Sequence, residues 1–207
     1  MPPHNLRERL IARTVKVIAS EGLDKTTTKA IVTGTGINEA YIYRTFSHKE
    51  DLLSKTFDRL DEELCLCVIK CIENVDLRSC NIEEECKEFF MGLWEFLLGN
   101  REKCLAFIRY YYSPYFTKYS ATDHKVRYAP VINASKKLFR AEANVWMIIC
   151  HVLNVMLDFA IKVFDGVIEN NRDTEEHVFF LIYNSIRPYF CERFLNEAEV
   201  AGICKSK

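Results

Sequence analysis

The fold is decided by residues 26–52, TTTKAIVTGTGINEAYIYRTFSHKEDL, where two short helices are predicted on either side of a glycine turn. Thr27 is the expected start of the first helix, predicted over residues 28–34, because a threonine hydroxyl can accept a hydrogen bond from a backbone N–H that lacks a partner within the helix. Gly36 then supplies the positive φ that a tight turn between two packed helices requires. The glycine therefore separates two helices.

The second helix is predicted over residues 38–45. Ile37, Ile42 and Phe46 recur at the spacing of one helical face, so this short helix can pack its apolar side inward. Its other face carries Asn38, Glu39, Tyr41, Arg44 and Thr45. A third helix is expected after Ser47, because serine is a favoured N-cap and the following acids suit a helix start. Two short helices joined by such a turn form a helix-turn-helix, which predicts duplex DNA as a partner.

The same stretch resembles the amino-terminal signature of the TetR family of bacterial transcriptional regulators. The spacing matches without a gap over about residues 5–55. The matching residues are Gly22, Thr26-Thr27, Ile31-Val32, Thr35-Gly36-Ile37, Tyr43, Phe46, Lys49 and Leu52. Val32 and Thr35 replace small alanines of the family, and Ala30 replaces its usual acid, so we expect the local helix packing to differ. The resemblance implies an all-α protein of about nine helices, with a three-helix DNA-binding head and a helical body that binds ligand and dimerises.

The helix over residues 38–45 is predicted to enter the major groove, where each base pair shows a distinct pattern of donors and acceptors. By its chemistry, Arg44 can bind guanine or a phosphate, or pair with a local acid instead. Glu39 can accept from cytosine, or can simply repel DNA. Further candidates from side-chain chemistry and position are Lys29, Asn38, Ala40, Tyr41 and Thr45.

Phosphate contacts are implied by the family resemblance. The positions that commonly touch phosphates in the family are Thr27, Thr28, Tyr43 and Lys49. Lys49 would additionally lie at the positive end of a helix, whereas Tyr43 could instead belong to the core. Phosphate contacts would set the register on the duplex and make the affinity depend on salt.

The net charge of −1 hides an uneven distribution. Residues 1–56 hold nine Lys or Arg and six Asp or Glu, which leaves 19 basic and 23 acidic residues in the rest. A net +3 head on a net −4 body can arise by chance in a short segment. Its sign is nevertheless the one that a DNA-binding head requires, and two copies would double the field at the phosphates.

Hydrophobic periodicity predicts helices along the whole chain, without a strand pattern or an internal repeat. The predicted helices span residues 5–20, 28–34, 38–45, 48–73, 82–99, 101–112, 123–139, 141–170 and 174–199. Residues 113–123 are expected to be irregular, and Pro130 is expected to bend or interrupt the helix that contains it. The predicted domains are a helix-turn-helix DNA-binding domain, residues 1–47, and a ligand-binding and dimerisation domain, residues 48–207.

The last two predicted helices have broad apolar faces. The first carries Trp146, Met147, Ile149, Cys150, Leu153, Met156, Leu157 and Ile161, and the second carries Phe179, Ile182, Ile186, Tyr189 and Phe190. One short recognition helix covers too few base pairs for useful specificity, so a dimer on two half-sites is expected. The resemblance implies a homodimer through these two helices; the alternative is that both faces belong to an intramolecular core.

Aromatic residues are concentrated in the middle of the chain, where they suit either an ordinary core or a pocket for a hydrophobic or aromatic small molecule. The resemblance implies a pocket, and its predicted lining is Trp94, Phe107, Tyr111, Tyr115, Trp146 and Asn154. The predicted function is a ligand-responsive transcriptional regulator, a repressor that binds a palindromic operator and is released when a small-molecule effector tilts the long helix beginning at His48.

Nine cysteines, an odd number without a secretory signal, predict reduced thiols and a cytoplasmic protein. The cluster Cys65, Cys67 and Cys71 leaves open a redox or metal sensor on the same scaffold, although free cysteine also behaves as a small hydrophobe. No cofactor is predicted. The sequence has no nucleophile elbow, phosphate-binding glycine loop or metal motif, so an enzyme in the helical body is the less favoured alternative.

A membrane span is not expected, because no stretch of 18 uninterrupted apolar residues occurs. The nearest is residues 145–164, which contains His151, Asn154, Asp158 and Lys162.

Overall fold

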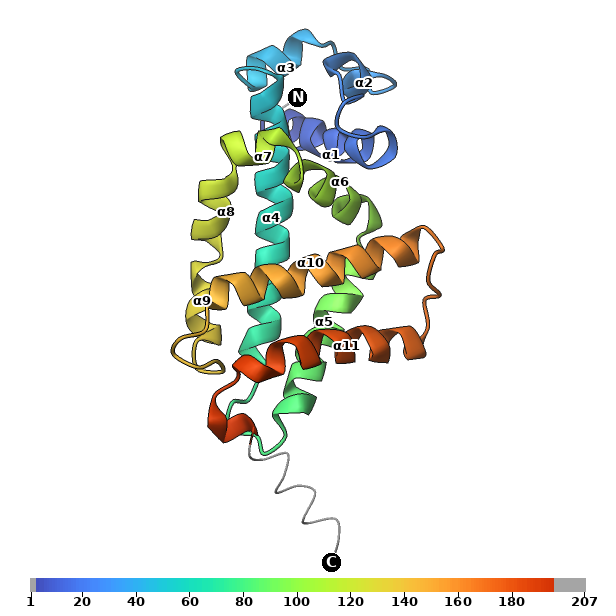
Figure 1. Cartoon of the computed structure of the whole chain (residues 1–207). Helices are drawn as coiled ribbons and strands as arrows, with labels where there is room; N and C mark the ends of the chain where they lie inside the picture. The colour runs from blue at the N-terminus through green and yellow to red at the C-terminus, as the bar shows by residue number, and fades with distance from the viewer. Residues whose placement is uncertain (1–2, 196–207) are drawn as a thin grey trace, which may run out of the picture. The chain divides into compact units, whose positions relative to one another are not determined.

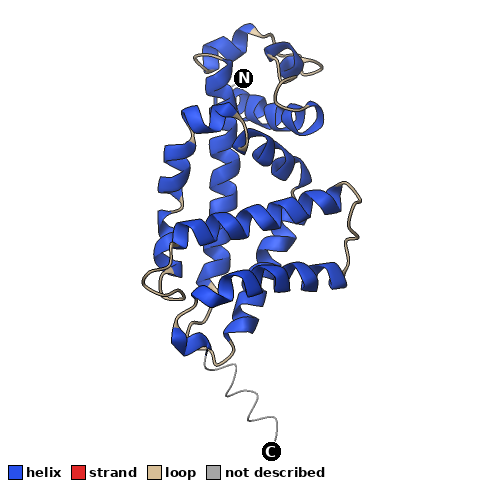
Figure 2. Cartoon of the chain, viewed as in Figure 1, coloured by secondary structure: helices blue, strands red, loops and turns tan. Residues whose placement is uncertain are grey.

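The computed structural model describes residues 3–195, and these form eleven α-helices and one short 3-10 helix (Figure 2). Strands are absent from the described residues, which contain a single isolated β-bridge between Phe139 and Phe190. The all-α prediction is confirmed. The number of helices is higher than the expected nine, because the middle of the chain is divided more finely than its hydrophobic periodicity indicates.

The helices follow one another along the chain as labelled in Figure 1. Their bounds are α1 (Pro3–Glu21), α2 (Thr28–Val32), α3 (Ala40–Thr45), α4 (Lys49–Glu73), α5 (Ile82–Leu98), α6 (Arg101–Tyr111), α7 (Pro114–Tyr119), α8 (Ala121–Arg127), α9 (Ala129–Ser135), α10 (Val145–Phe164), α11 (Arg172–Ile186) and the 3-10 helix η1 (Arg187–Tyr189).

Two prolines account for the additional helices. Residues 113–123 were expected to be irregular, but Pro114 starts α7, and α8 follows almost at once. The single helix expected over residues 123–139 is instead α8 and α9, with Pro130 in the first turn of α9. Proline is well suited to the first turn of a helix, where its missing N–H costs nothing, so here it begins helices instead of bending one.

The two long closing helices are shorter than expected. Asn144 caps α10, since its Oδ1 accepts from the N–H of Met147 at 3.2 Å, and Gly166, with φ +69°, follows the end of the helix. α11 ends at Ile186, and η1 follows directly, with Pro188 as its second residue. The final part of the helix expected over residues 174–199 lies outside the described residues.

The chain divides into two compact units, which are each discontinuous in sequence. The first unit consists of Met1–Leu64 and Asn100–Arg127, and the second of Cys65–Gly99 and Tyr128–Lys207. The boundary inside α4 gives each unit part of that helix. The functional division at residue 48 remains a prediction.

The first unit contains an apolar cluster that holds the amino-terminal helices together. Its members are Leu10, Ile11, Ile31, Ile42, Phe46 and Leu52, with Leu6, Val32 and Ile37 packed against them. α1 also packs along α6, where the guanidinium of Arg109 donates to the carbonyls of Ile18 and Ala19 at 2.6 and 2.7 Å. These carbonyls lie in the last turn of α1, where that of Ile18 also accepts from the N–H of Gly22 at 3.0 Å. Arg109 therefore caps α1 from another element.

A buried polar cluster lies deeper in the first unit. Asp61 of α4 is 0% exposed, and its carboxylate accepts from His124 Nδ1 at 2.9 Å and from Arg127, both on α8. Arg127 also reaches Asp58, at 3.4 Å. Beside this polar cluster, Phe57 packs against several aromatic rings. The shortest of these distances is to Tyr110, 4.8 Å between ring centroids. A buried charge is tolerated when it is paired in this way.

The second unit is built around α10, which packs against α5, α9 and α11. By length and composition alone, α10 is the one described helix that could cross a membrane. Core helices of soluble proteins pass the same test. Its inner face is buried in the unit, with Met156, Leu157 and Ala160 almost inaccessible.

Candidate functional site

The turn of the helix-turn-helix is built by two glycines and a threonine. Gly34 and Gly36 have φ values of +73° and +70°, which glycine adopts without strain. Between them, Thr35 Oγ1 donates to the carbonyl of Val32 at 2.6 Å and accepts from the N–H of Ile37 at 3.1 Å. The threonine at this position thus makes a hydrogen-bonded turn that an alanine could not make.

Side chains cap both helices of the motif. Thr27 accepts from the N–H of Ala30 at 3.1 Å, which confirms it as the N-cap of α2. Asn38 Oδ1 accepts from the N–H of Ala40 at 2.9 Å before α3 begins. The third helix is capped differently from expectation: the N–H of Asp51 donates to His48 Nδ1 at 3.0 Å, so His48 takes the role predicted for Ser47. The N–H of Ser47 donates to the Asp51 carboxylate instead.

Two arginines of α1 fix the end of α2 and the turn. Arg13 donates to the carbonyls of Ile31 and Thr33 at 3.3 and 3.2 Å, and Arg9 donates to the carbonyl of Thr35 at 3.4 Å. A cation at the carboxyl end of a helix is also favoured by the helix dipole. These arginines therefore position the helix-turn-helix, and their guanidinium groups bind backbone carbonyls of the protein itself.

The outward face of α3 is exposed and carries the basic and aromatic residues predicted to meet DNA. Tyr43 is 58% exposed, which argues against the alternative that it belongs to the core. Arg44 lies over the ring of Tyr41, with its guanidinium carbon 5.4 Å from the ring centroid. Other predicted contacts that are exposed are Thr27, Lys29, Asn38 and Ala40, while Thr45 and Lys49 are half-buried.

Two predicted DNA contacts are bound to each other. Thr28 Oγ1 donates to Glu39 Oε2 at 2.7 Å, which ties the start of α2 to the residue before α3. Both side chains are half-buried. A carboxylate that accepts from a neighbouring hydroxyl can still face a base, but its first role here is to hold the two helices in register.

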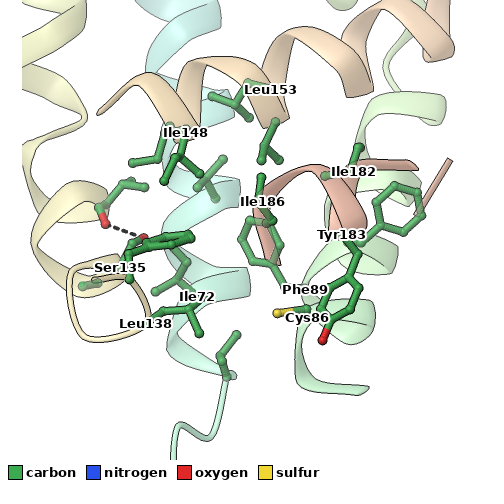
Figure 3. Close-up of a pocket in the computed structure, with 18 of the residues that line it drawn as sticks. Ile72, Cys86, Phe89, Ser135, Leu138, Ile148, Leu153, Ile182, Tyr183 and Ile186 are labelled. Carbon is green, nitrogen blue, oxygen red and sulfur yellow. Dashed lines mark hydrogen bonds between the residues drawn. The ribbon is translucent and has the colours of Figure 1, made fainter. Parts of the chain in front are cut away.

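A cavity of about 410 Å³ lies within the second unit (Figure 3). Its wall is formed by α4, α5, α9, α10 and α11 together with the segments that follow α4 and α9. The lining residues are Val68, Ile72, Glu73, Val75, Leu77, Cys86, Phe89, Phe90, Val131, Asn133, Ala134, Ser135, Lys137, Leu138, Phe139, Ile148, Ile149, Val152, Leu153, Met156, Phe179, Ile182, Tyr183 and Ile186. Most of them are aliphatic or aromatic, so the cavity suits a largely apolar molecule.

Two polar groups of this wall, the Cys86 thiol and the Tyr183 hydroxyl, are neutral, and the exposed side chains of Glu73 and Lys137 also line it. Burial raises the pKa of the Cys86 thiol to about 12, and the nearby Glu83 and Glu85 carboxylates add to the increase. Burial, followed by the charge of Glu83, likewise raises the pKa of Tyr183 to about 12. Both groups therefore keep their protons at neutral pH. Figure 3 shows them among apolar neighbours, where they can serve as weak hydrogen-bonding partners without attracting a counter-ion.

None of the six residues predicted to line the pocket lies in the wall of this cavity. Phe107, Tyr111 and Tyr115 belong to the first unit, where Phe107 stacks on Tyr111 with 5.8 Å between ring centroids. The other three, Trp94, Trp146 and Asn154, belong to the second unit. The wall of this cavity does contain aromatic rings, but they are other ones, Phe89, Phe90, Phe139, Phe179 and Tyr183, which lie among aliphatic residues of α4 and α10.

Within the second unit, Trp94 is a core residue and Trp146 is half-buried. Trp94 is almost fully buried and stacks on Phe90, 5.7 Å away between centroids. Trp146 packs against Tyr128 at 6.0 Å. Asn154 is half-buried on α10. Val68 and Ile72, which line the cavity, recur at helical spacing late in α4, but the same spacing also describes an ordinary core face.

Comparisons with known proteins agree with this geometry. A sequence profile described as bacterial regulatory proteins, tetR family, matches residues 10–56, which include α2 and α3. No curated protein matches the chain in sequence.

Solved structures share the fold over most of their length. A TetR family transcription regulator from Marinobacter aquaeolei VT8 superposes with a TM-score of 0.70 at 17% identity, covering 86% of this chain and 93% of that one. A TetR-family transcriptional regulator from Haemophilus influenzae Rd gives 0.67 at 18%, covering 91% and 98%. A TetR-like transcriptional regulator from Rhodococcus sp. RHA1 gives 0.61 at 16%, covering 90% and 99%. Residues 10–56 thus match the tetR family of bacterial regulatory proteins in sequence, and the chain is similar in fold to solved regulators of that family.

Proposed function

We propose that this protein is a transcriptional repressor that binds a palindromic operator as a homodimer and leaves it when a small molecule binds the body. The observation that carries the proposal is the exposed face of α3, where Tyr41, Tyr43 and Arg44 project from a helix-turn-helix that is fixed on its inner side. An arginine can pair with guanine or with a phosphate, and tyrosine hydroxyls suit phosphates.

A second copy would cover the outer faces of α10 and α11. In the most apolar stretch of α10, only 33% is buried within one chain, which leaves most of this apolar helix without a neighbour from its own chain. Met147 on α10 and Phe180 and Leu181 on α11 are exposed. In the dimer that we propose, these residues would lie in a bundle of four helices, and the two α3 helices would meet half-sites about 34 Å apart.

The effector that we propose is neutral and largely apolar, and it occupies the cavity of the second unit. Val68 and Ile72 of α4 line the cavity. The same helix is continuous from Lys49, at its first residue, to these two positions. We infer that the effector shifts this helix and thereby changes the separation of the two recognition helices. A coupling of about 1–3 kcal/mol would weaken operator binding by roughly 5- to 150-fold.

Selection of DNA from a random pool with the purified full-length protein tests the proposal. We expect a palindromic site with two half-sites one helical turn apart. Lys49→Ala removes one phosphate contact from each subunit of the dimer, so the slope of log affinity against log salt should become shallower by about 1.8. Lys70→Ala, which removes the same charge from an exposed position on α4, should leave the slope unchanged. Absence of any sequence preference at physiological salt would contradict the proposal.

The effector step has its own test. Small apolar compounds that raise the melting temperature of the protein would be titrated into the operator complex, and we expect at least one of them to lower operator affinity. If every stabilising compound leaves the affinity unchanged, the cavity has no regulatory role.

The other possible triggers, thiol oxidation or a bound metal, predict a different outcome: alkylating the cysteines would change operator affinity. Turnover of a bound compound would instead indicate an enzyme.

A further inference from the structure

Cys67 and Cys71 lie one turn apart on α4, within the second unit, and their side chains interact with each other. Both side chains are half-buried, so a small reagent can reach them. A hydrogen bond from Cys67 lowers the pKa of Cys71 to about 7, and the same contact raises the pKa of Cys67. Cys71 therefore gives up its proton more readily than an ordinary cysteine, while Cys67 beside it keeps its own.

Gly92 of α5 leaves room for the Cys71 sulfur. A β-carbon added at Gly92 would lie 3.1 Å from Cys71 Sγ, so a larger side chain would press on the sulfur atom. Glycine in the middle of a helix costs about 0.5–1 kcal/mol relative to alanine. Gly92 is itself exposed. The glycine thus keeps the sulfur of Cys71 accessible at the seam between α4 and α5.

The Cys67 and Cys71 pair provides two sulfur ligands. Among residues 3–195, no group of three or more His, Cys, Asp or Glu side chains is placed to hold a metal ion. Cys65 is buried and lies about 200° around the helix from Cys67. A tetrahedral zinc site needs four protein ligands and does not fit. A soft ion or metalloid that is satisfied by two sulfur atoms does fit, because thiolates prefer soft partners.

Helix geometry favours a bridged pair over a direct disulfide. Residues four apart on a helix have β-carbons about 5–6 Å apart, whereas a disulfide needs about 3.5–4.5 Å. Oxidation would therefore deform α4, while one atom inserted between the sulfurs matches the spacing. We propose that Cys67 and Cys71 form a bidentate site for a soft thiophilic species of the trivalent arsenic type.

The binding reaction needs no oxidant or reductant. With phenylarsine oxide as the probe, two S–As bonds form, and the two thiol protons leave with the arsenic-bound oxygen as one molecule of water. Arsenic remains trivalent and keeps its phenyl group. Each sulfur contributes the electron pair of its new bond to arsenic.

Intact mass measurement on the full-length protein tests the site. The protein is incubated with one equivalent of phenylarsine oxide in excess 2-mercaptoethanol, which removes arsenic held by a single cysteine. We expect one adduct, which a dithiol such as 2,3-dimercaptopropanol then strips. The adduct should be lost in Cys67→Ala and in Cys71→Ala, and kept in Cys80→Ala, which removes an exposed cysteine outside the pair.

A further variant keeps both thiols and changes only their surroundings. Gly92→Leu raises helix propensity, so it should fold, but its side chain would crowd Cys71. We expect adduct formation to slow about tenfold, which corresponds to about 1.4 kcal/mol. An adduct that survives in either cysteine variant, or that never forms in the unaltered protein, would overturn the site. An unchanged rate in Gly92→Leu would overturn the role given to the glycine.

Discussion

Replacing Asp61 by alanine should destabilise the first unit far more than removing a surface charge. The Asp61 carboxylate is fully buried and accepts from His124 at 2.9 Å and from Arg127. The acid comes from α4 and the two donors come from α8, 63 and 66 residues further along the chain. The substitution therefore removes the charge that joins these helices and leaves two polar side chains without the carboxylate that they face.

The expected loss follows from the burial of the partners. A hydrogen bond to a charged group contributes about 1.5–3 kcal/mol, so two give about 3–6 kcal/mol. Breaking a buried ion pair typically costs about 3–5 kcal/mol, which agrees. Solvent screening is weak, because the side chains of His124 and Arg127 are only 6% and 23% exposed. With about 2–4 °C per kcal/mol for a chain of this size, the melting temperature should fall by roughly 6–20 °C.

Thermal unfolding followed by far-ultraviolet circular dichroism measures this change. Both tryptophans lie in the second unit, so tryptophan fluorescence reports that unit separately. The matched control is Glu62→Ala, the next residue on α4, whose exposed carboxylate is 3.7 Å from Arg59. Its effect should stay within about 0.5 kcal/mol.

Two results would refute the explanation for Asp61. One is an Asp61→Ala variant as stable as Glu62→Ala. The other is a double-mutant cycle of Asp61→Ala with His124→Ala that gives a coupling below about 0.5 kcal/mol, the level expected for residues that do not interact.

The remaining predictions concern the backbone of the helix-turn-helix and its support. Arg109→Ala should lower the free energy of unfolding by about 1.5–3 kcal/mol in urea, because two carbonyls at the end of α1 lose a charged donor; Arg109→Lys should recover part of the loss, and equal losses would argue against the cap. Gly36→Ala should cost about 1–2 kcal/mol, because φ is +70° although no atom lies within 4 Å of the added carbon. Gly36→Asn should be milder than Gly36→Ala, since asparagine tolerates this conformation better. The same cost for both would mean that steric contact, not φ, controls the position.

Local features of the helix-turn-helix could be predicted from sequence because local chemistry decides them. Thr27 caps α2, Gly36 has a positive φ, and Ile42 and Phe46 are buried, as their types and spacing indicated. The identity of the cap before α4 was wrong, because histidine and serine can both accept from the same N–H and only the backbone geometry selects between them.

Features that depend on distant parts of the chain could not be predicted. The pairing of Asp61 with His124 joins residues 63 positions apart, and no periodicity indicates it. The cavity exists because several helices fail to fill the space between them, which is a property of their packing and not of any one segment. Pro130 was expected to bend or interrupt a helix and in fact begins one, because a proline that begins a helix and one that bends a helix look alike in sequence.

The division of α4 between two units has a consequence for protein engineering. The first unit is completed only by residues 100–127, which supply Tyr110 and His124 next to Phe57. A fragment that stops after residue 64 would expose this aromatic surface, so the amino-terminal part is not a cassette that can be cut out and fused elsewhere. If α3 reads DNA as proposed, new specificity is better introduced by exchanging its outward side chains in place, which leaves the supporting core intact.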